Sequence, residues 1–156
     1  MPQEPLFDPA RYDVNKPLFD KEAIRKFNQQ RFEMEQLDGV LFHDEEKQMI
    51  GGFLRLPSDA WWSRGHFPGH PILPGVLALE AAGQLCSIYF HQVQKGHRMG
   101  LAKVEEARFF RMMEPPGILY LVGKLVHQRS RFAQFQVQGF QDGVVAFEAL
   151  FTGASI

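Results

Sequence analysis

Polar and apolar residues alternate along several short runs of the chain, which is the pattern of β-strands with one covered face. The run QFQVQGF shows it most clearly, and the turn QDG that follows leads into VVAFEALF, which predicts a β-hairpin. The first two strand-like runs are joined by the charged turn HDEEK. The six strands expected from these runs are 37–42, 48–56, 99–107, 117–127, 131–140 and 144–152.

One segment between the strands is apolar on nearly all sides. The run GVLALEAAGQLCSIYFHQVQ begins at Gly75 and contains Glu80 as its only acidic residue. A helix that is apolar all round is buried on most sides. Pro74 suits its first turn, and Gly96 can end it. We therefore expect an α+β architecture in which an antiparallel sheet of about six strands curls around one long central helix.

Residues 1–18 differ from the rest of the chain because they are rich in proline and have no periodic pattern. We expect them to form an N-terminal arm that lies on the surface or on a partner. Residues 19–156 are expected to form a single domain, in which Asp20 caps a short helix. The apolar residues that could anchor the arm are Leu6, Phe7, Tyr12 and Leu18.

Composition and charge narrow the range of functions. The net charge of −1 gives no general basis for binding nucleic acid or an anionic membrane. No uncharged apolar stretch of about 18 residues occurs, so no membrane span is expected. Cys86 is the only cysteine, and the N-terminus lacks the features of a signal peptide, so a reducing, cytoplasmic compartment is the simple interpretation. The 15 phenylalanines indicate a core or a ligand pocket built from aromatic rings.

The stretch RGHFPGHPILPGVLALEAAGQ, residues 64–84, concentrates the candidate chemistry. Pro68 and Gly69 disfavour a helix around His66, so its ring is held by a turn. Glu80 lies about one and a half turns into the predicted helix. Histidine is a base near neutral pH, and a carboxyl group in apolar surroundings can stay protonated and donate its proton. His66 and Glu80 are therefore a candidate base and acid pair.

The start of the predicted helix adds a third element. The free N–H groups of Gly75 and Val76 point out of the helix, where its dipole favours negative charge and where a carbonyl oxygen would be polarised. A base, an acid and such amides suit the loss of a proton from the carbon next to a thioester, followed by departure of the 3-hydroxyl as water. Phe67 could line a pocket for this substrate, and Gln84, one turn after Glu80, could orient the carboxyl group. The substrate-binding candidates are Gly75, Val76, Phe67 and Gln84.

The same residues have plainer interpretations. A histidine before Phe-Pro is often a turn residue bonded to the backbone, and a lone glutamate in a helix often faces water. His66, His70 and Glu80 could also suggest a metal site, but helical ligands at that spacing need an unbroken helix, which Pro68 and Gly69 prevent. We therefore expect neither a metal ion nor another cofactor.

The run GHFPGHPILPGVLALEAAGQ closely resembles the signature of the β-hydroxyacyl-acyl-carrier-protein dehydratases of fatty acid synthesis, which have the hot-dog fold. His66 and the acid Glu80 have the family's spacing of fourteen residues, and glutamate rather than aspartate is typical of its dehydratase branch. The run VEEARFFRMMEPPG is also similar to the family. The chain departs from it at QRFEM, where a His-Arg-Tyr-Pro-Phe run is usual, and at Ile118, where aspartate is common.

The resemblance implies that His66 is the catalytic base, that Glu80 is its acid partner and that the Gly75 amide binds the thioester carbonyl. It implies dehydration of 3-hydroxyacyl thioesters to trans-2-enoyl thioesters in fatty acid or related lipid biosynthesis. The implied partner is acyl carrier protein with a phosphopantetheine-linked substrate. A homodimer, or a trimer of dimers, is implied because the two catalytic side chains of one site come from different protomers. A hot-dog thioesterase and a non-catalytic acyl-binding protein are the alternatives, against which the intact pair argues.

Overall fold

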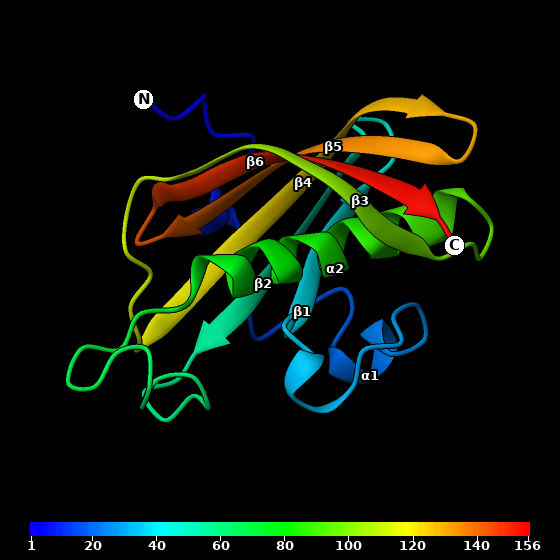
Figure 1. The fold of residues 1–156 in the computed structure, drawn as a ribbon. Helices are drawn as coiled ribbons and strands as arrows, with labels where there is room; N and C mark the ends of the chain where they lie inside the picture. The colour runs from blue at the N-terminus through cyan, green and yellow to red at the C-terminus, as the bar shows by residue number, and fades with distance from the viewer.

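A computed structural model describes all residues, 1–156, and shows six antiparallel strands that curl around one long helix (Figure 1). The strand order across the sheet is β1-β2-β4-β5-β6-β3. The strands are β1 Gly39–Asp44, β2 Met49–Leu56, β3 Met99–Phe109, β4 Gly117–Arg129, β5 Phe132–Gln141 and β6 Val144–Ser155. The helices are α1 Lys21–Ile24 and α2 Gly75–Val93, with 3-10 turns η1 Pro9–Arg11 and η2 Phe32–Met34. None of the helices is both long and apolar enough to cross a membrane.

The side of α2 that faces the sheet consists of small and apolar residues, so the helix lies close to the strands. Ala78, Ala81 and Ala82 are buried there. At Cys86 the approach is so close that a Cβ atom on Gly123 of β4 would lie 2.7 Å from Sγ. Complete burial raises the pKa of the Cys86 thiol, so this cysteine is an inert core residue.

The predicted hairpins and the predicted helix are confirmed with small changes at their ends. The turn between β5 and β6 places Asp142 and Gly143 at φ of 55° and 74°, the left-handed values that a two-residue hairpin turn requires. The backbones of β1 and β2 approach closely at Gly51, where a side chain would overlap the ring of Phe42 on β1. The helix ends at Val93, slightly before the predicted position.

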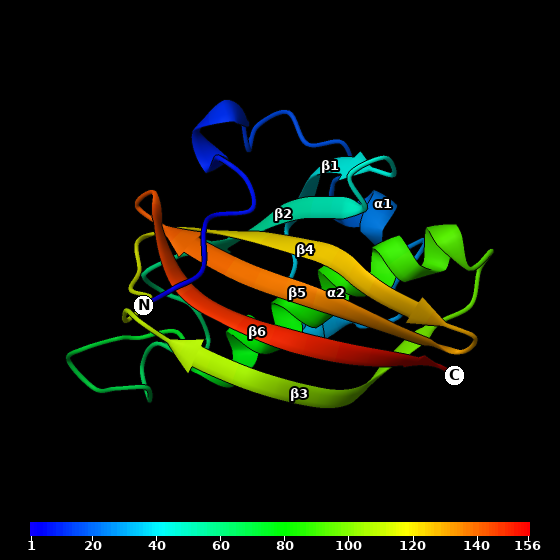
Figure 2. The same ribbon diagram turned by 90° about the horizontal axis from the view of Figure 1, so that it is seen from above.

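The N-terminal arm lies on the outer face of the sheet, on the side away from α2 (Figure 2). Gln138 of β5 is fully buried beneath it, and its amide accepts from Leu6 N–H at 2.8 Å and donates to Glu4 C=O at 3.0 Å. The ring of Phe7 packs edge-on against Phe140, with centroids 5.2 Å apart. The arm is therefore fixed by both hydrogen bonds and aromatic contacts.

Leu18 does not anchor the arm as expected. Its side chain is 53% exposed, whereas its backbone N–H donates to the carbonyl of Val40 at 2.8 Å. Phe19 continues this contact as an isolated bridge to Val40. The end of the arm is thus held by backbone pairing to β1, which the apolar pattern does not signal. The division of the chain at residue 18 remains a prediction.

Deletion of residues 1–18 should lower the melting temperature, because it exposes the ring of Phe140 to water and removes the two hydrogen bonds between Gln138 and the arm. Phe7→Ala should reproduce part of the loss, about 1–3 kcal/mol of unfolding free energy. Urea unfolding measures this effect. Leu18→Ala is the control and should change little, since that side chain is exposed. Equal stability of the deletion variant and the intact chain would contradict the docking of the arm.

Candidate active site

The turn before α2 fixes the ring of His66. Its Nδ1 lies 2.7 Å from the carbonyl oxygen of Ile72, and the Ile72 N–H donates to the carbonyl of His66 at 2.8 Å. The backbone N–H of His66 donates to Trp62 C=O at 2.9 Å. A carbonyl can only accept, so Nδ1 carries the proton in the neutral ring. Nε2 is therefore left as the basic nitrogen.

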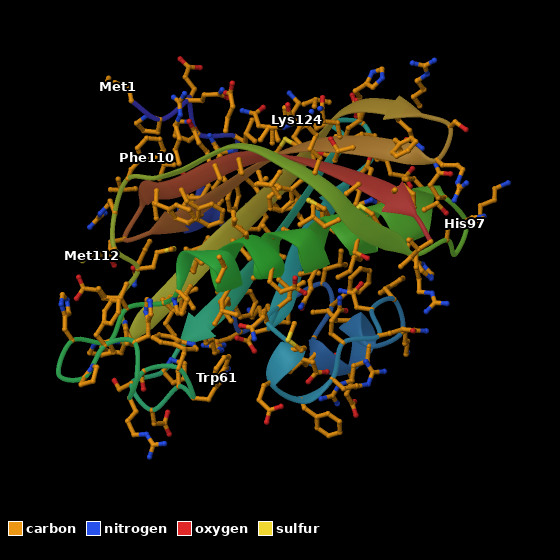
Figure 3. All side chains as sticks on the ribbon, viewed as in Figure 1. Met1, Trp61, His97, Phe110, Met112 and Lys124 are labelled. Atoms are coloured by element: carbon orange, nitrogen blue, oxygen red, sulfur yellow. The ribbon has the colours of Figure 1, made fainter.

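An open depression of about 440 Å³ lies beside this ring. It is lined by Trp61, Trp62, Arg64, Gly65, His66, Pro74, Val76 and Leu77. Phe67 does not line it: its ring stacks on the His66 ring, with centroids 4.0 Å apart, and is half exposed. Trp61 and Met112 lie at this end of the molecule, and His97 lies at the opposite end (Figure 3).

The first turn of α2 offers unpaired donors at the edge of the depression. The N–H groups of Gly75 and Val76 make no hydrogen bond within the chain, and the Val76 side chain is 73% exposed. Gly75 is packed so tightly that a Cβ atom there would lie 2.8 Å from the ring of Phe109. The helix start therefore presents unpaired N–H donors, and their binding of a carbonyl oxygen stays a prediction.

Glu80 is half-buried on α2, and Gln84 controls the position of its carboxyl group. The amide of Gln84 donates to Glu80 Oε1 at 2.9 Å and to Met34 C=O at 2.6 Å, and it accepts from Gln36 N–H at 3.0 Å. The side chain of Gln84 is buried, so each of these bonds is protected from water. Oε2 of Glu80 makes no hydrogen bond within the chain.

The segment that covers Gln84 is held in two further ways. Asn28 is buried and donates its amide hydrogen to the carbonyl of Gln84 at 3.0 Å. Arg25 and Glu35 form an ion pair at 2.5 Å, and the bond to the Arg25 guanidinium lowers the pKa of the Glu35 carboxyl group. Sequence reasoning did not identify this support, because most of the contacts to Gln84 come from backbone groups that leave no motif.

Within one chain the two catalytic candidates are not brought together. No hydrogen bond joins His66 and Glu80, and Glu80 does not line the depression beside His66. No cluster of three histidine, cysteine, aspartate or glutamate side chains is arranged to hold a metal ion. A single chain therefore presents a base with amide donors at one place and an oriented carboxyl group at another.

Comparison with known proteins identifies the family. The model of the FabA-like domain matches residues 28–150. The chain belongs to this family. It is 30% identical over 135 residues to 3-hydroxyacyl-[acyl-carrier-protein] dehydratase FabZ of Fusobacterium nucleatum, covering 86% of this chain and 96% of the relative. It is 38% identical over 136 residues to the enzyme of the same name from Pectobacterium atrosepticum, covering 82% and 87%.

Solved structures of a dehydratase complex and of a thioesterase confirm the fold. The dehydratase heterocomplex ApeI:P of Xenorhabdus doucetiae superimposes with a TM-score of 0.71 at 16% identity, covering 85% of this chain and 90% of that one. A mutant of thioesterase PA1618 from Pseudomonas aeruginosa gives 0.65 at 17% identity, covering 90% and 96%. At such identities the likeness establishes the hot-dog architecture.

Replacement of Gln84 by leucine should lower the free energy of unfolding by about 1–3 kcal/mol, because it leaves the buried N–H of Gln36 without an acceptor. The matched control is Gln92→Leu on the same helix. The amide of Gln92 makes no hydrogen bond and its Oε1 is buried without a partner, so this change should cost little. Chemical unfolding of both variants measures the difference. Equal losses in the two variants would show that the Gln84 contacts contribute nothing specific.

Proposed function

We infer that this chain is a 3-hydroxyacyl-[acyl-carrier-protein] dehydratase of fatty acid synthesis. The observation that carries this function is the position of His66. Its Nδ1 is anchored on Ile72, and its ring shares one depression with Val76, whose free N–H lies at the start of α2. The similarity to relatives named 3-hydroxyacyl-[acyl-carrier-protein] dehydratase supports the same reaction. The enzyme removes water from a 3-hydroxyacyl thioester and forms the trans-2-enoyl thioester.

The reaction begins with proton transfer to His66. Nε2 takes the proton from C2 of the acyl chain, and the electron pair of the broken C–H bond moves toward the thioester carbonyl. The N–H groups of Gly75 and Val76 stabilise the negative charge that develops on the carbonyl oxygen. The pair then returns to form the C2=C3 double bond while the C3–O bond breaks. The hydroxyl group leaves with one proton as water.

The source of that last proton is Glu80 in the direct form of the proposal. With Oε1 held by Gln84, a protonated carboxyl group donates from Oε2 to the departing hydroxyl. In the alternative form, His66 returns the proton that it has taken, and Glu80 holds the water. Both forms need Glu80 of one chain beside His66 of another, since the two do not meet within a single chain.

A homodimer supplies this arrangement. Strand β3 lies at an edge of the sheet, and its outer backbone groups have no partner strand. Its apolar side chains Leu101, Val104 and Phe109 are 47%, 39% and 45% exposed. A long edge strand with exposed apolar residues is prone to pair with another chain. Pairing through β3 in a dimer, or further assembly as a trimer of dimers, would cover these residues.

The proposed partner is acyl carrier protein with a phosphopantetheine-linked substrate. Arg64 lines the depression beside His66 and carries the positive charge suited to the phosphate of that arm. The cytoplasm remains the expected location of this chain, in keeping with its single, buried cysteine.

His66→Ala and Glu80→Gln should each lower hydration of a 2-enoyl thioester by about 10²–10⁴, the usual cost of losing a general base or acid. Loss of enoyl absorbance measures the rate, and the unchanged melting temperature of each variant shows that it is folded. His97→Ala is the control, because His97 lies at the far end of the molecule (Figure 3). Near-normal turnover in either catalytic variant would refute the assigned roles, and release of free thiol without hydration of the double bond would identify a thioesterase.

Mixing the inactive His66→Ala and Glu80→Gln variants should restore part of the activity. In a mixed dimer, one of the two sites combines an intact His66 with an intact Glu80, which is about one quarter of all sites after full exchange. Native mass spectrometry confirms that exchange has occurred. An inactive mixture with proven mixed dimers would show that each site is built within one chain.

A further inference from the structure

Gln141, the last residue of β5, is a buried polar side chain with no part in the chemistry described above. It is 7% exposed, and its amide bonds twice to the backbone of a single residue, Glu114. Oε1 accepts from Glu114 N–H at 3.1 Å, and Nε2 donates to Glu114 C=O at 2.7 Å. Such a two-point contact fixes both the position and the orientation of the Glu114 backbone.

The sequence makes room for this contact. Gln141 Nε2 lies so close to Gly117 at the start of β4 that a Cβ atom there would be 2.7 Å from it. Any other residue at this position would displace the amide. The two hydrogen bonds from Gln141 of β5 therefore clamp the segment between β3 and β4 at Glu114, although this segment does not pair with β5.

The clamped segment leads directly to the candidate base. Met113, next to Glu114, is buried, and its carbonyl accepts from the N–H of Leu73 at 2.8 Å. Leu73 follows Ile72, whose carbonyl holds Nδ1 of His66. Leu73 is also two residues before Gly75, whose N–H is proposed to donate to the thioester carbonyl of the substrate. One hydrogen bond therefore supports both groups of the site.

We propose that Gln141 is a positioning residue for His66 and for the start of α2. It acts through Glu114, Met113 and Leu73, and it sets the direction of the Ile72 carbonyl that keeps the proton on Nδ1 of His66. The inference rests on the function proposed above. Without the clamp, the loop moves, the Nδ1 bond weakens, and the proton distributes between the two ring nitrogens. Nε2 then loses part of its availability as the base.

The chain contains a matched control on the same strand. Gln138 is also a buried β5 glutamine, and its amide also makes two bonds to backbone groups. Gln138 and Gln141 are three residues apart, so they project to opposite faces of the sheet. Gln138 holds the N-terminal arm on the outer face, whereas Gln141 holds the loop on the side of the site. The two substitutions remove similar bonds and differ in what those bonds support.

The experiment compares the full-length wild type, Gln141→Leu and Gln138→Leu. Both variants should lose stability in thermal unfolding. Gln141→Leu alone should lower kcat/KM for enoyl hydration about tenfold, mainly through kcat. It should also shift the ¹⁵N resonances of the His66 ring toward a tautomer mixture, which a purely structural role would not do. Gln141→Met, which keeps the length of the side chain without the amide, should give the same two changes if the leucine variant is too unstable to assay.

Two results would overturn the inference. One is unchanged kcat/KM and unchanged His66 resonances in a folded Gln141→Leu or Gln141→Met variant. The other is an equal loss of kcat/KM in Gln138→Leu, which would make the effect one of general stability. The resonances report on His66 without turnover. A wild type that is inactive but shows the tautomer shift on substitution would therefore refute the proposed function and leave the positioning role of Gln141 supported.

Discussion

The burial of a single apolar helix within a curled sheet is the constraint on which the rest of the structure depends. Helix α2 is too apolar to be exposed, so the sheet covers it along the side that carries Ala78, Ala81 and Ala82. Its first turn must stay open if the N–H groups are to meet a substrate. The burial accordingly stops at Val76, whose side chain is largely exposed. The proposed site lies at the first turn of α2, where the sheet no longer covers the helix.

The face of α2 that the sheet does not cover raises a second problem, because it carries polar groups that need partners. Gln84 solves it with a neutral amide, which satisfies donors and acceptors without the cost of burying a charge. Its contacts to Met34 and Gln36 bind the preceding segment to the helix, and the remaining amide hydrogen is directed to Glu80. The side chain of Gln84 thus holds both the preceding segment and the carboxyl group of Glu80.

The features that could be predicted from the sequence are those set by residues adjacent in the chain. Alternation in QFQVQGF identifies a strand, and proline and glycine around His66 identify a turn, without reference to the rest of the chain. The support of the site could not be predicted in this way. The backbone partners of Gln84 precede it by 50 and 48 residues, and a carbonyl or N–H group exists at nearly every position. The apolar character of Leu18 was misleading because its backbone, and not its side chain, makes the contact.

In strand β5, buried glutamines indicate contacts with segments that are distant in the sequence. Its buried polar residues are amides, which satisfy a donor and an acceptor of the same backbone segment. Burial of a glutamine side chain in a strand costs free energy unless a neighbouring segment offers it both a backbone N–H and a backbone C=O. A buried glutamine in a strand therefore indicates a nearby loop whose backbone groups are not paired with another strand. Gln138 forms these hydrogen bonds with the N-terminal arm, and Gln141 forms them with the connection between β3 and β4. Because alternate residues face opposite sides, β5 holds the N-terminal arm on its outer face and the connection between β3 and β4, which contacts the segment after His66, on its inner face.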